Sequence, residues 1–258
     1  AAYTQDYPEL ADHLQRMQRH ELPDHWDADL QMFPADARGM AGREASAKVL
    51  NAIAARVPWI MGGSADLTPS TKTRLLMAGA GDFSAGAYEG RNVHFGVREH
   101  AMGAVMNGLC LCGVRPYGSG FFIFSDYGRP SLRLAALMEL PVIYVFTHDS
   151  IGVGEDGPTH QPVEQLPSLR AMPGLITVRP ADANEVLEAW RLIMPLMRGP
   201  VALLLTRQAL PTFDRTRYAP ASGVARGAYV LADAADGPPD VLLLASGSEV
   251  ALCLDARD

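Results

Sequence analysis

The residues best suited to chemistry lie in one glycine-rich stretch, FTHDSIGVGEDGPTHQP, at positions 146–162. It contains His148, Asp156 and His160. Histidine can donate to hydroxyl groups and exchange protons near neutral pH, and a carboxylate can accept a hydrogen bond from a substrate hydroxyl. Glycines let the backbone fold tightly, so the three side chains can converge on one pocket. The plainer interpretation is a surface loop in which the histidines are structural and Asp156 forms a turn beside Gly157.

The same stretch contains GVGEDG (152–157), a formal match to the dinucleotide-binding pattern G-x-G-x-x-G, and it follows an apolar run at 141–146. That motif requires a helix that starts at its third glycine, because the helix N-terminus holds the pyrophosphate. Pro158 and Pro162 follow Gly157 within five residues and argue against such a helix. The sequence therefore does not favour a dinucleotide site.

The segments around this loop alternate between strand-like and helix-like patterns. Strands that are apolar throughout are typical of a parallel sheet covered on both faces by helices, so we expect an α/β fold. In such sheets, functional sites collect beyond the carboxyl ends of the strands, where the polar loops of this sequence also begin. The expected strands are 58–63, 92–97, 115–122, 141–146, 174–180 and 199–207, and the expected helices are 42–57, 98–113, 131–140 and 181–194.

Composition divides the chain into four expected parts. Residues 1–38 hold eight acids and three arginines and resemble an extended arm or linker, while residues 39–211 form the α/β domain. The stretch 212–240 is rich in Pro, Ala, Gly and Asp and is interpreted as a connector. Residues 241–258 begin a new strand–turn–helix unit. One such unit cannot bury its own faces, so we interpret it as the start of a truncated C-terminal α/β domain.

Composition also argues against several classes of protein. A net charge of −7 disfavours a broad nucleic-acid or anionic membrane surface. No run approaches the ~20 apolar residues of a membrane span, and the N-terminal residues lack a signal-peptide pattern. The cysteines, Cys110, Cys112 and Cys253, do not have the spacing of a zinc site or a disulfide framework. We therefore expect a cytoplasmic location and no metal site within this chain.

The loop at 146–162 closely resembles the sugar-binding loop of transketolases, the thiamine-diphosphate enzymes that transfer two-carbon ketol units. The resemblance covers nearly the whole chain and is strongest over 39–211, which is similar to the family's pyrimidine-binding domain. It implies a thiamine-diphosphate-binding fold, preceded by an interdomain linker and followed by the start of a C-terminal domain. Three other stretches agree with the family in order and spacing: GGSADLTPS (62–70), FGVREHAMGAVMNG (95–108) and TRQALP (206–211).

The resemblance also implies which parts of a site lie elsewhere. Transketolases hold a divalent metal, magnesium or calcium, and the cofactor diphosphate through a Gly-Asp-Gly motif in an N-terminal domain, and that motif does not occur in this sequence. In the family, each active site combines that domain from one subunit with the pyrimidine-binding domain of the other. We therefore expect a homodimer with its active site at the subunit interface, and no activity from this chain alone.

Five residues match family positions at the cofactor. Glu99 matches the glutamate that hydrogen-bonds a ring nitrogen of the aminopyrimidine, a catalytic role that needs a carboxyl able to share a proton. Phe121, Phe124 and Tyr127 match the lining of the pyrimidine pocket, with Phe124 as the stacking partner. Asp66 matches a residue at the cofactor and subunit contact. Without the resemblance, Glu99 is interpreted as a first-turn glutamate favoured by the helix dipole, and the aromatic residues as a core stripe.

Further residues match the family's contacts to the sugar. The resemblance implies that His148 contacts the first hydroxyl and carbonyl region of the donor, and that Asp156 contacts the neighbouring hydroxyl. It also implies catalytic roles for His148 and His160. An arginine fork fits phosphate bidentately, although alone each arginine would be read as a surface charge. The residues that match the sugar-phosphate end are Arg43, Ser70, His160 and Arg207.

The resulting hypothesis is a transketolase fragment. The intact enzyme would move a two-carbon ketol unit from a ketose phosphate to an aldose phosphate. One alternative is an enzyme like dihydroxyacetone synthase, which shares the scaffold but uses formaldehyde as acceptor. The other is a non-catalytic half-site or interaction fragment, against which the retained functional residues argue.

Overall fold

Six parallel strands form the central sheet of the protein. The computed structural model describes residues 2–234 and 237–257. The strand order is β3-β2-β4-β5-β7-β6, and every neighbouring pair is parallel. The strands are β2 (Ile60–Ser64), β3 (Asn92–His94), β4 (Arg115–Phe121), β5 (Ile143–Thr147), β6 (Ile176–Val178) and β7 (Val201–Leu205).

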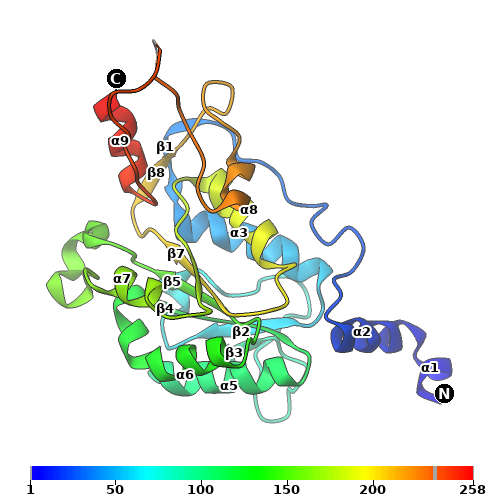
Figure 1. Cartoon of the computed structure of the whole chain (residues 1–258). Coiled ribbons are helices and arrows are strands. Elements are labelled where there is room, and N and C mark those ends of the chain that lie inside the picture. Colours follow the sequence, from blue (N-terminus) through cyan, green and yellow to red (C-terminus); the bar gives the residue numbers. More distant parts are fainter. Residues whose placement is uncertain (1, 235–236, 258) are drawn as a thin grey trace.

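Helices cover both faces of this sheet, with α3 and α8 on one face and α5 and α6 on the other (Figure 1). Successive residues of a strand point to opposite faces. In β5, Val145 therefore packs with α3 and α8, while Tyr144 and Phe146 belong to the core under α5 and α6. Burial on both faces explains the apolar strand sequences and confirms the expected fold class. These helices are α3 (Gly42–Arg56), α5 (Glu99–Leu111), α6 (Ser125–Leu137) and α8 (Ala183–Ile193).

The remaining elements lie outside this sandwich. An N-terminal arm of two largely exposed helices projects from the body (Figure 1), and two strands pair antiparallel in a separate small sheet. Among the described residues, no helix is long and apolar enough to cross a membrane. The elements are α1 (Ala2–Asp6), α2 (Pro8–Arg19), β1 (Asp36–Ala41), α4 (Thr68–Thr71), α7 (Gln165–Arg170), β8 (Ala209–Thr212), α9 (Glu249–Arg257) and the 3-10 helices η1 (Phe122–Phe124), η2 (Ile151–Asp156), η3 (Pro158–His160) and η4 (Ala221–Arg226).

The register of the strands brings their carboxyl ends to one edge of the sheet. Ser64 of β2 pairs with Ser119 of β4. Phe121, at the end of β4, pairs with Thr147 of β5, and Thr147 pairs with Leu205 of β7. The loops that follow these strands therefore start side by side, at the edge where parallel sheets carry their sites.

Two elements in or next to the α/β domain differ from the sequence-based expectation. The segment after β7, expected to be a loop, contains β8, which pairs with β1 although the paired residues are at least 168 positions apart in the sequence. The helix expected at 131–140 begins at Ser125 and ends at Leu137. Pro130 lies inside that helix, in its second turn, where it removes one backbone donor without ending the helix.

The strand expected at the start of 241–258 is not formed, although α9 forms as expected. Val241, Leu242 and Leu244 are exposed, with Leu244 at 90%. A strand requires a neighbouring strand to complete its hydrogen-bond ladder, and none of the described strands pairs with this segment. The prediction of a strand is wrong for the described residues, because this segment has the pattern of a strand but no neighbouring strand to pair with.

Asp182 joins α8 to the segment that follows β8. Its carboxylate accepts hydrogen bonds from the backbone N–H groups of Glu185, at 2.8 Å, and Phe213, at 3.0 Å. The first of these caps α8. The same buried carboxylate lies 2.8 Å from the guanidinium of Arg215. Its removal would leave several buried donors without a partner, which costs more than a surface substitution.

We expect Asp182→Ala to lower the free energy of unfolding by about 3 kcal/mol, since it removes a helix cap and one partner of a buried ion pair. Urea unfolding followed by circular dichroism measures the loss. Asp214→Ala is the matched control, because the half-buried Asp214 makes similar local hydrogen bonds, to the exposed Thr216. If both variants lost the same free energy of unfolding, the buried contacts of Asp182 would not contribute to stability.

Candidate functional site

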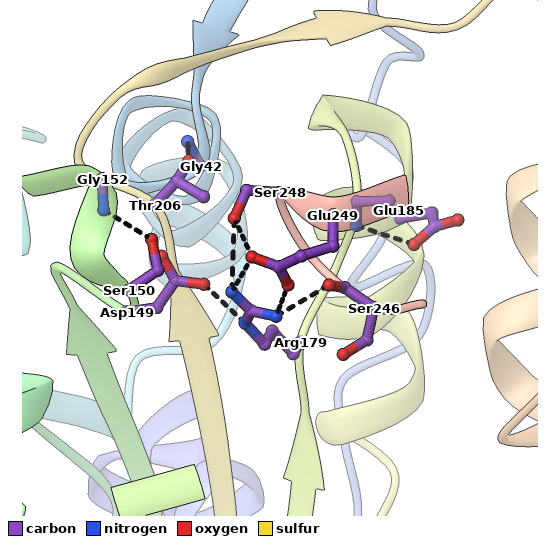
Figure 2. Close-up of polar contacts among 11 residues, drawn as sticks. Gly42, Asp149, Ser150, Gly152, Arg179, Glu185, Thr206, Ser246, Ser248 and Glu249 are labelled. Atoms are coloured by element: carbon purple, nitrogen blue, oxygen red, sulfur yellow. Dashed lines mark hydrogen bonds and ion pairs between the residues drawn. The ribbon is translucent and has the colours of Figure 1, made fainter. Parts of the chain in front are cut away.

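The carboxyl edge of the sheet gathers the loops that carry most of the expected site residues. Phe121 ends β4, and the 3-10 turn η1 leads directly into α6. His148 follows β5, and Arg207 follows β7 after one residue. Arg43 is the second residue of α3, whose N-terminus reaches the end of β7: the Gly42 N–H donates to Thr206 Oγ1 at 2.9 Å (Figure 2).

A ladder of aromatic rings leads from the buried edge of the sheet to solvent. Phe121, 7% exposed, stacks on His148 with ring centroids 3.6 Å apart. Phe124 stacks on Phe121 at 6.1 Å and on Tyr127 at 5.9 Å, and it meets His160 edge-on at 5.4 Å. Tyr127 is 67% exposed. The expected pyrimidine-pocket residues and the two loop histidines therefore form one cluster, which begins in the core and ends at an open ring face.

His148 is buried and held in an unusual backbone conformation. Its φ is +59°, in the left-handed region that non-glycine residues seldom occupy. Its Nδ1 lies 2.9 Å from Thr147 Oγ1, and its Nε2 lies 3.7 Å from an oxygen of Asp156. Burial, with a further contribution from the Arg43 charge, lowers the pKa of His148 to about 4. The imidazole is therefore neutral at pH 7.

Two glycines return the loop to His148. Gly154 and Gly157 have φ values of +76° and +75°, and between them η2 ends at Asp156. After Gly157 the chain makes only the 3-10 turn η3 before Gln161 becomes extended. No α-helix follows the third glycine, so the dinucleotide interpretation fails for the reason the prolines indicated.

Two arginines distant in sequence meet at the same edge. The charge of Arg207 and burial both lower the pKa of Arg43, with burial the larger cause. Arg43 Nη1 donates to the Ser70 carbonyl at 2.8 Å, while its buried Nε has no hydrogen-bond partner among the residues that the structure describes. Arg207 forms an ion pair with Glu155 of the loop. Arg43, Ser70 and Arg207 are thus brought together, with one buried donor still unsatisfied.

Glu99 is the first residue of α5, and only 7% of it is exposed. It packs against α6, where a Cβ added to Gly128 would lie 3.7 Å from Glu99 Cβ. Within residues 2–234 and 237–257, its carboxylate makes no hydrogen bond or ion pair. A largely enclosed carboxyl of this kind can bind a group from outside these residues.

Asp66, an expected cofactor residue, lies apart from the aromatic ladder. It follows β2 with φ at +64° and lines an open groove of about 1040 Å³ together with Lys72, His94 and Gly96. No ring of the ladder lines this groove. Its role at the cofactor stays a prediction. Over the described ranges, no group of three or more His, Cys, Asp or Glu is arranged to hold a metal ion.

Sequence reasoning missed four polar residues at this edge. Thr147 contacts the His148 ring, and Thr206 binds the start of α3. Asp149 and Arg179 form a buried ion pair directly beside His148. Arg179 follows β6, so the rule that sites lie beyond strand ends could have identified it. The pairing itself depends on strands that are distant in sequence.

Comparisons with known proteins agree on one family. Residues 38–212 match the family described as "Transketolase, pyrimidine binding domain". The chain is 55% identical to the transketolase of Geobacillus stearothermophilus over 259 residues, covering 100% of this chain and 38% of that protein. The transketolase of Pichia stipitis in complex with sedoheptulose 7-phosphate superposes with a TM-score of 0.91 at 45% identity, covering 99% of this chain and 38% of that chain. A split-gene transketolase described as an inactive β4 tetramer gives a TM-score of 0.55 at 30% identity, covering 68% of this chain and 55% of that chain. The chain spans 38% of the length of the curated relatives named here.

We expect His148 to destabilise the fold as the pH falls. Its folded pKa of about 4 lies below the ordinary value of 6.5, so the unfolded chain binds a proton more readily between these values. The destabilisation is nearly absent above pH 6.5 and reaches roughly 2 kcal/mol near pH 5. His148→Gln should remove this part of the pH dependence, measured by urea unfolding at pH 5 and pH 7.

The matched control is His25→Gln, since His25 is exposed and also has a positive φ, of +56°. It should keep the pH dependence of the parent. An unchanged difference between pH 5 and pH 7 in His148→Gln would contradict the assignment of a buried neutral imidazole.

Proposed function

Because this chain belongs to the transketolase family, as its pyrimidine-binding domain, we propose that the protein transfers a two-carbon ketol unit from a ketose phosphate to an aldose phosphate with thiamine diphosphate. The observation that carries the proposal is the convergence of the neutral His148 with Asp156, Arg43 and Arg207 at one sheet edge. The chain covers only part of its relatives' length, so the activity is proposed for the protein that contains it.

Four residues of this chain fit the aminopyrimidine end of thiamine diphosphate. Glu99 is buried without a partner among the described residues, and a ring nitrogen of the cofactor would supply one. Phe124, with Tyr127 beside it, would supply an aromatic ring for offset stacking with the heteroaromatic ring, and Phe121 stacks on Phe124 from the buried side. When bound, the cofactor supplies a nucleophilic carbon that accepts the ketol unit. Glu99 would hold a proton between its carboxyl oxygen and the ring nitrogen, which is general acid–base work.

The loop after β5 would bind the reacting end of the sugar. His148 Nδ1 is engaged with Thr147, whereas Nε2 is too far from Asp156 for a hydrogen bond and is free for a substrate hydroxyl. Asp156 would accept a hydrogen bond from the neighbouring hydroxyl and so read its configuration. His160, edge-on to Phe124, would exchange protons at the mouth of the same pocket.

The two arginines would bind the phosphate end. Arg43 and Arg207 repel each other, and within residues 2–234 and 237–257 the buried Nε of Arg43 has no acceptor. A phosphate placed between them would offset the repulsion and accept from that donor through charge-assisted hydrogen bonds. Ser70, whose carbonyl holds Arg43, would orient the fork toward the phosphate.

Other parts of the proposal rest on family membership rather than on these contacts. Another domain would hold a magnesium or calcium ion together with the cofactor diphosphate, and Asp66 would contact the cofactor. The protein would be a homodimer with its active site at the subunit interface. It would act in the cytoplasm, in sugar-phosphate metabolism. Sedimentation of the full-length protein with and without magnesium and cofactor tests the dimer.

A second candidate is a half-site that is inactive without a partner chain. The resemblance to a split-gene transketolase described as an inactive tetramer favours it. An enzyme like dihydroxyacetone synthase is a further alternative. Assays of the full-length protein with formaldehyde and with aldose phosphates as acceptors separate these possibilities.

In the full-length protein, Glu99→Gln should lower turnover by about 10²–10⁴-fold, because an amide cannot share the proton at the ring nitrogen. The melting temperature should change little. Steady-state kinetics and hydrogen–deuterium exchange at the reactive carbon of the cofactor measure the effect. Glu9→Gln is the matched control, since Glu9 is also a first-turn glutamate but lies exposed in the arm. Exchange at the parent rate in Glu99→Gln would rule out this role.

Arg207→Ala should impair phosphorylated donors more than unphosphorylated ones. One charge-assisted contact contributes roughly 1.5–3 kcal/mol, or about one to two decades in kcat/KM. The measurement compares xylulose 5-phosphate with hydroxypyruvate in the parent and the variant. Arg198→Ala, which removes an exposed arginine before β7, should affect neither donor. Equal losses for both donors would mean that Arg207 does not bind the phosphate.

A further inference from the structure

Asp149, the residue after His148, is anchored in the core of the protein. Its side chain is completely buried, and Oδ2 accepts a hydrogen bond from Arg179 Nε at 2.7 Å (Figure 2). The other carboxylate oxygen has no partner within the described residues. Burial raises the pKa of the Asp149 carboxyl, and the Arg179 charge opposes that rise. A carboxylate in this position depends on Arg179 to remain charged and in place.

Arg179 is itself fixed by a turn near the C-terminus, Ser246–Glu249. Its Nη1 donates to the Ser246 carbonyl at 2.7 Å, and the guanidinium forms an ion pair with Glu249 (Figure 2). The Gly247 N–H donates back to the Arg179 carbonyl at 3.0 Å. Gly247 has φ at +63°, and a Cβ there would lie 2.7 Å from Arg179 Nε. The turn is therefore built closely around the guanidinium.

This arrangement spans the end of the sheet. In the strand order β5-β7-β6, Arg179 follows β6 and reaches past the end of β7 to the loop after β5. His148 starts that loop in a left-handed conformation, which persists only where the surroundings fix it. Thr147 and Phe121 hold the imidazole ring, but neither holds the chain on the other side of the His148 Cα. The Asp149–Arg179 pair supplies that second anchor.

We propose that Arg179 is a positioning residue that fixes the backbone of His148 by holding Asp149, so that the imidazole Nε2 faces the sugar. The inference rests on the proposed function for the role of His148 in sugar binding. The anchoring itself does not depend on the reaction. The competing explanation is that Arg179 only holds the segment 246–257 against the sheet. In that case, replacing Arg179 would not change the backbone protection of the loop after β5.

Hydrogen–deuterium exchange followed by mass spectrometry on the full-length protein separates the two explanations. In Arg179→Met, the amides of 148–157 and of 246–257 should both exchange at least tenfold faster than in the parent. Arg179→Lys keeps a charge for Asp149 but cannot form the fork to the turn, so it should restore protection at 148–157 and not at 246–257. Asp149→Asn should speed exchange at the amides of 148–157 and leave 246–257 unchanged. Arg170→Met, at an exposed arginine that ends α7, is the control and should change neither segment.

Faster exchange confined to 246–257 in Arg179→Met would overturn the proposal. If that variant does not fold, Asp149→Asn decides: parent-like exchange at 148–157 in Asp149→Asn would overturn the proposal equally. Glu249→Gln should speed exchange only at the amides of 246–257, because the Arg179 contacts to Asp149 and Ser246 remain.

Steady-state kinetics provide a second test of the positioning role. Arg179→Met should lower kcat/KM for a ketose phosphate by about 10–100-fold and move the acid limb of the pH profile upward by about one pH unit. The reason is that greater access to water around the loosened loop favours the protonated imidazole. The other charged groups that face His148, namely Arg43, Asp156, Arg207 and His160, are unchanged in this variant.

A merely structural loss would scale the rate equally at every pH, so an unshifted acid limb would also count against the proposal. Thiamine diphosphate affinity should stay at the parent value. A parent protein without ketol transfer would refute the proposed function, while the exchange data would still decide whether Arg179 positions the loop.

Discussion

The parallel register of β4, β5 and β7 is the constraint on which the candidate site depends. Because Phe121, Thr147 and Leu205 end these strands at the same level, the next residues of three separate loops emerge together. Both faces of each strand are buried, so polar groups collect beyond the strand ends. A shift of one residue in β5 would turn His148 to the other face of the sheet and separate it from Phe121.

The fold could be predicted from the sequence because its strongest signals are local. Apolar runs and periodic runs alternate, and this pattern implies a covered parallel sheet. The pairing of β1 with β8 could not be predicted, since it joins residues on either side of the whole domain. The exposed segment from Val241 to Leu244 shows the opposite failure, in which strand-like composition lacks the neighbouring strand that a ladder requires.

The candidate site was predicted to the extent that its residues carry recognisable chemistry. His148, Asp156 and His160 stand out in a glycine-rich loop, and the structure gathers them beside Phe121 and Phe124. What the sequence could not show is which of these groups are charged and which have hydrogen-bond partners. The neutral His148 and the unpartnered Glu99 follow from burial by distant elements. The contact between Asp149 and Arg179 likewise forms only because the sheet places β6 two strands away from β5.

The meeting of Arg43 with Arg207 has a consequence for how the protein behaves in different buffers. Two guanidiniums held close together at the carboxyl edge of the sheet attract whichever small anion is most abundant, and the attraction weakens as ionic strength rises. Inorganic phosphate and sulfate have the charge and shape to occupy the same place. Ionic composition therefore acts as a competitor at this edge, and two laboratories using different salts would measure different affinities for one and the same ligand.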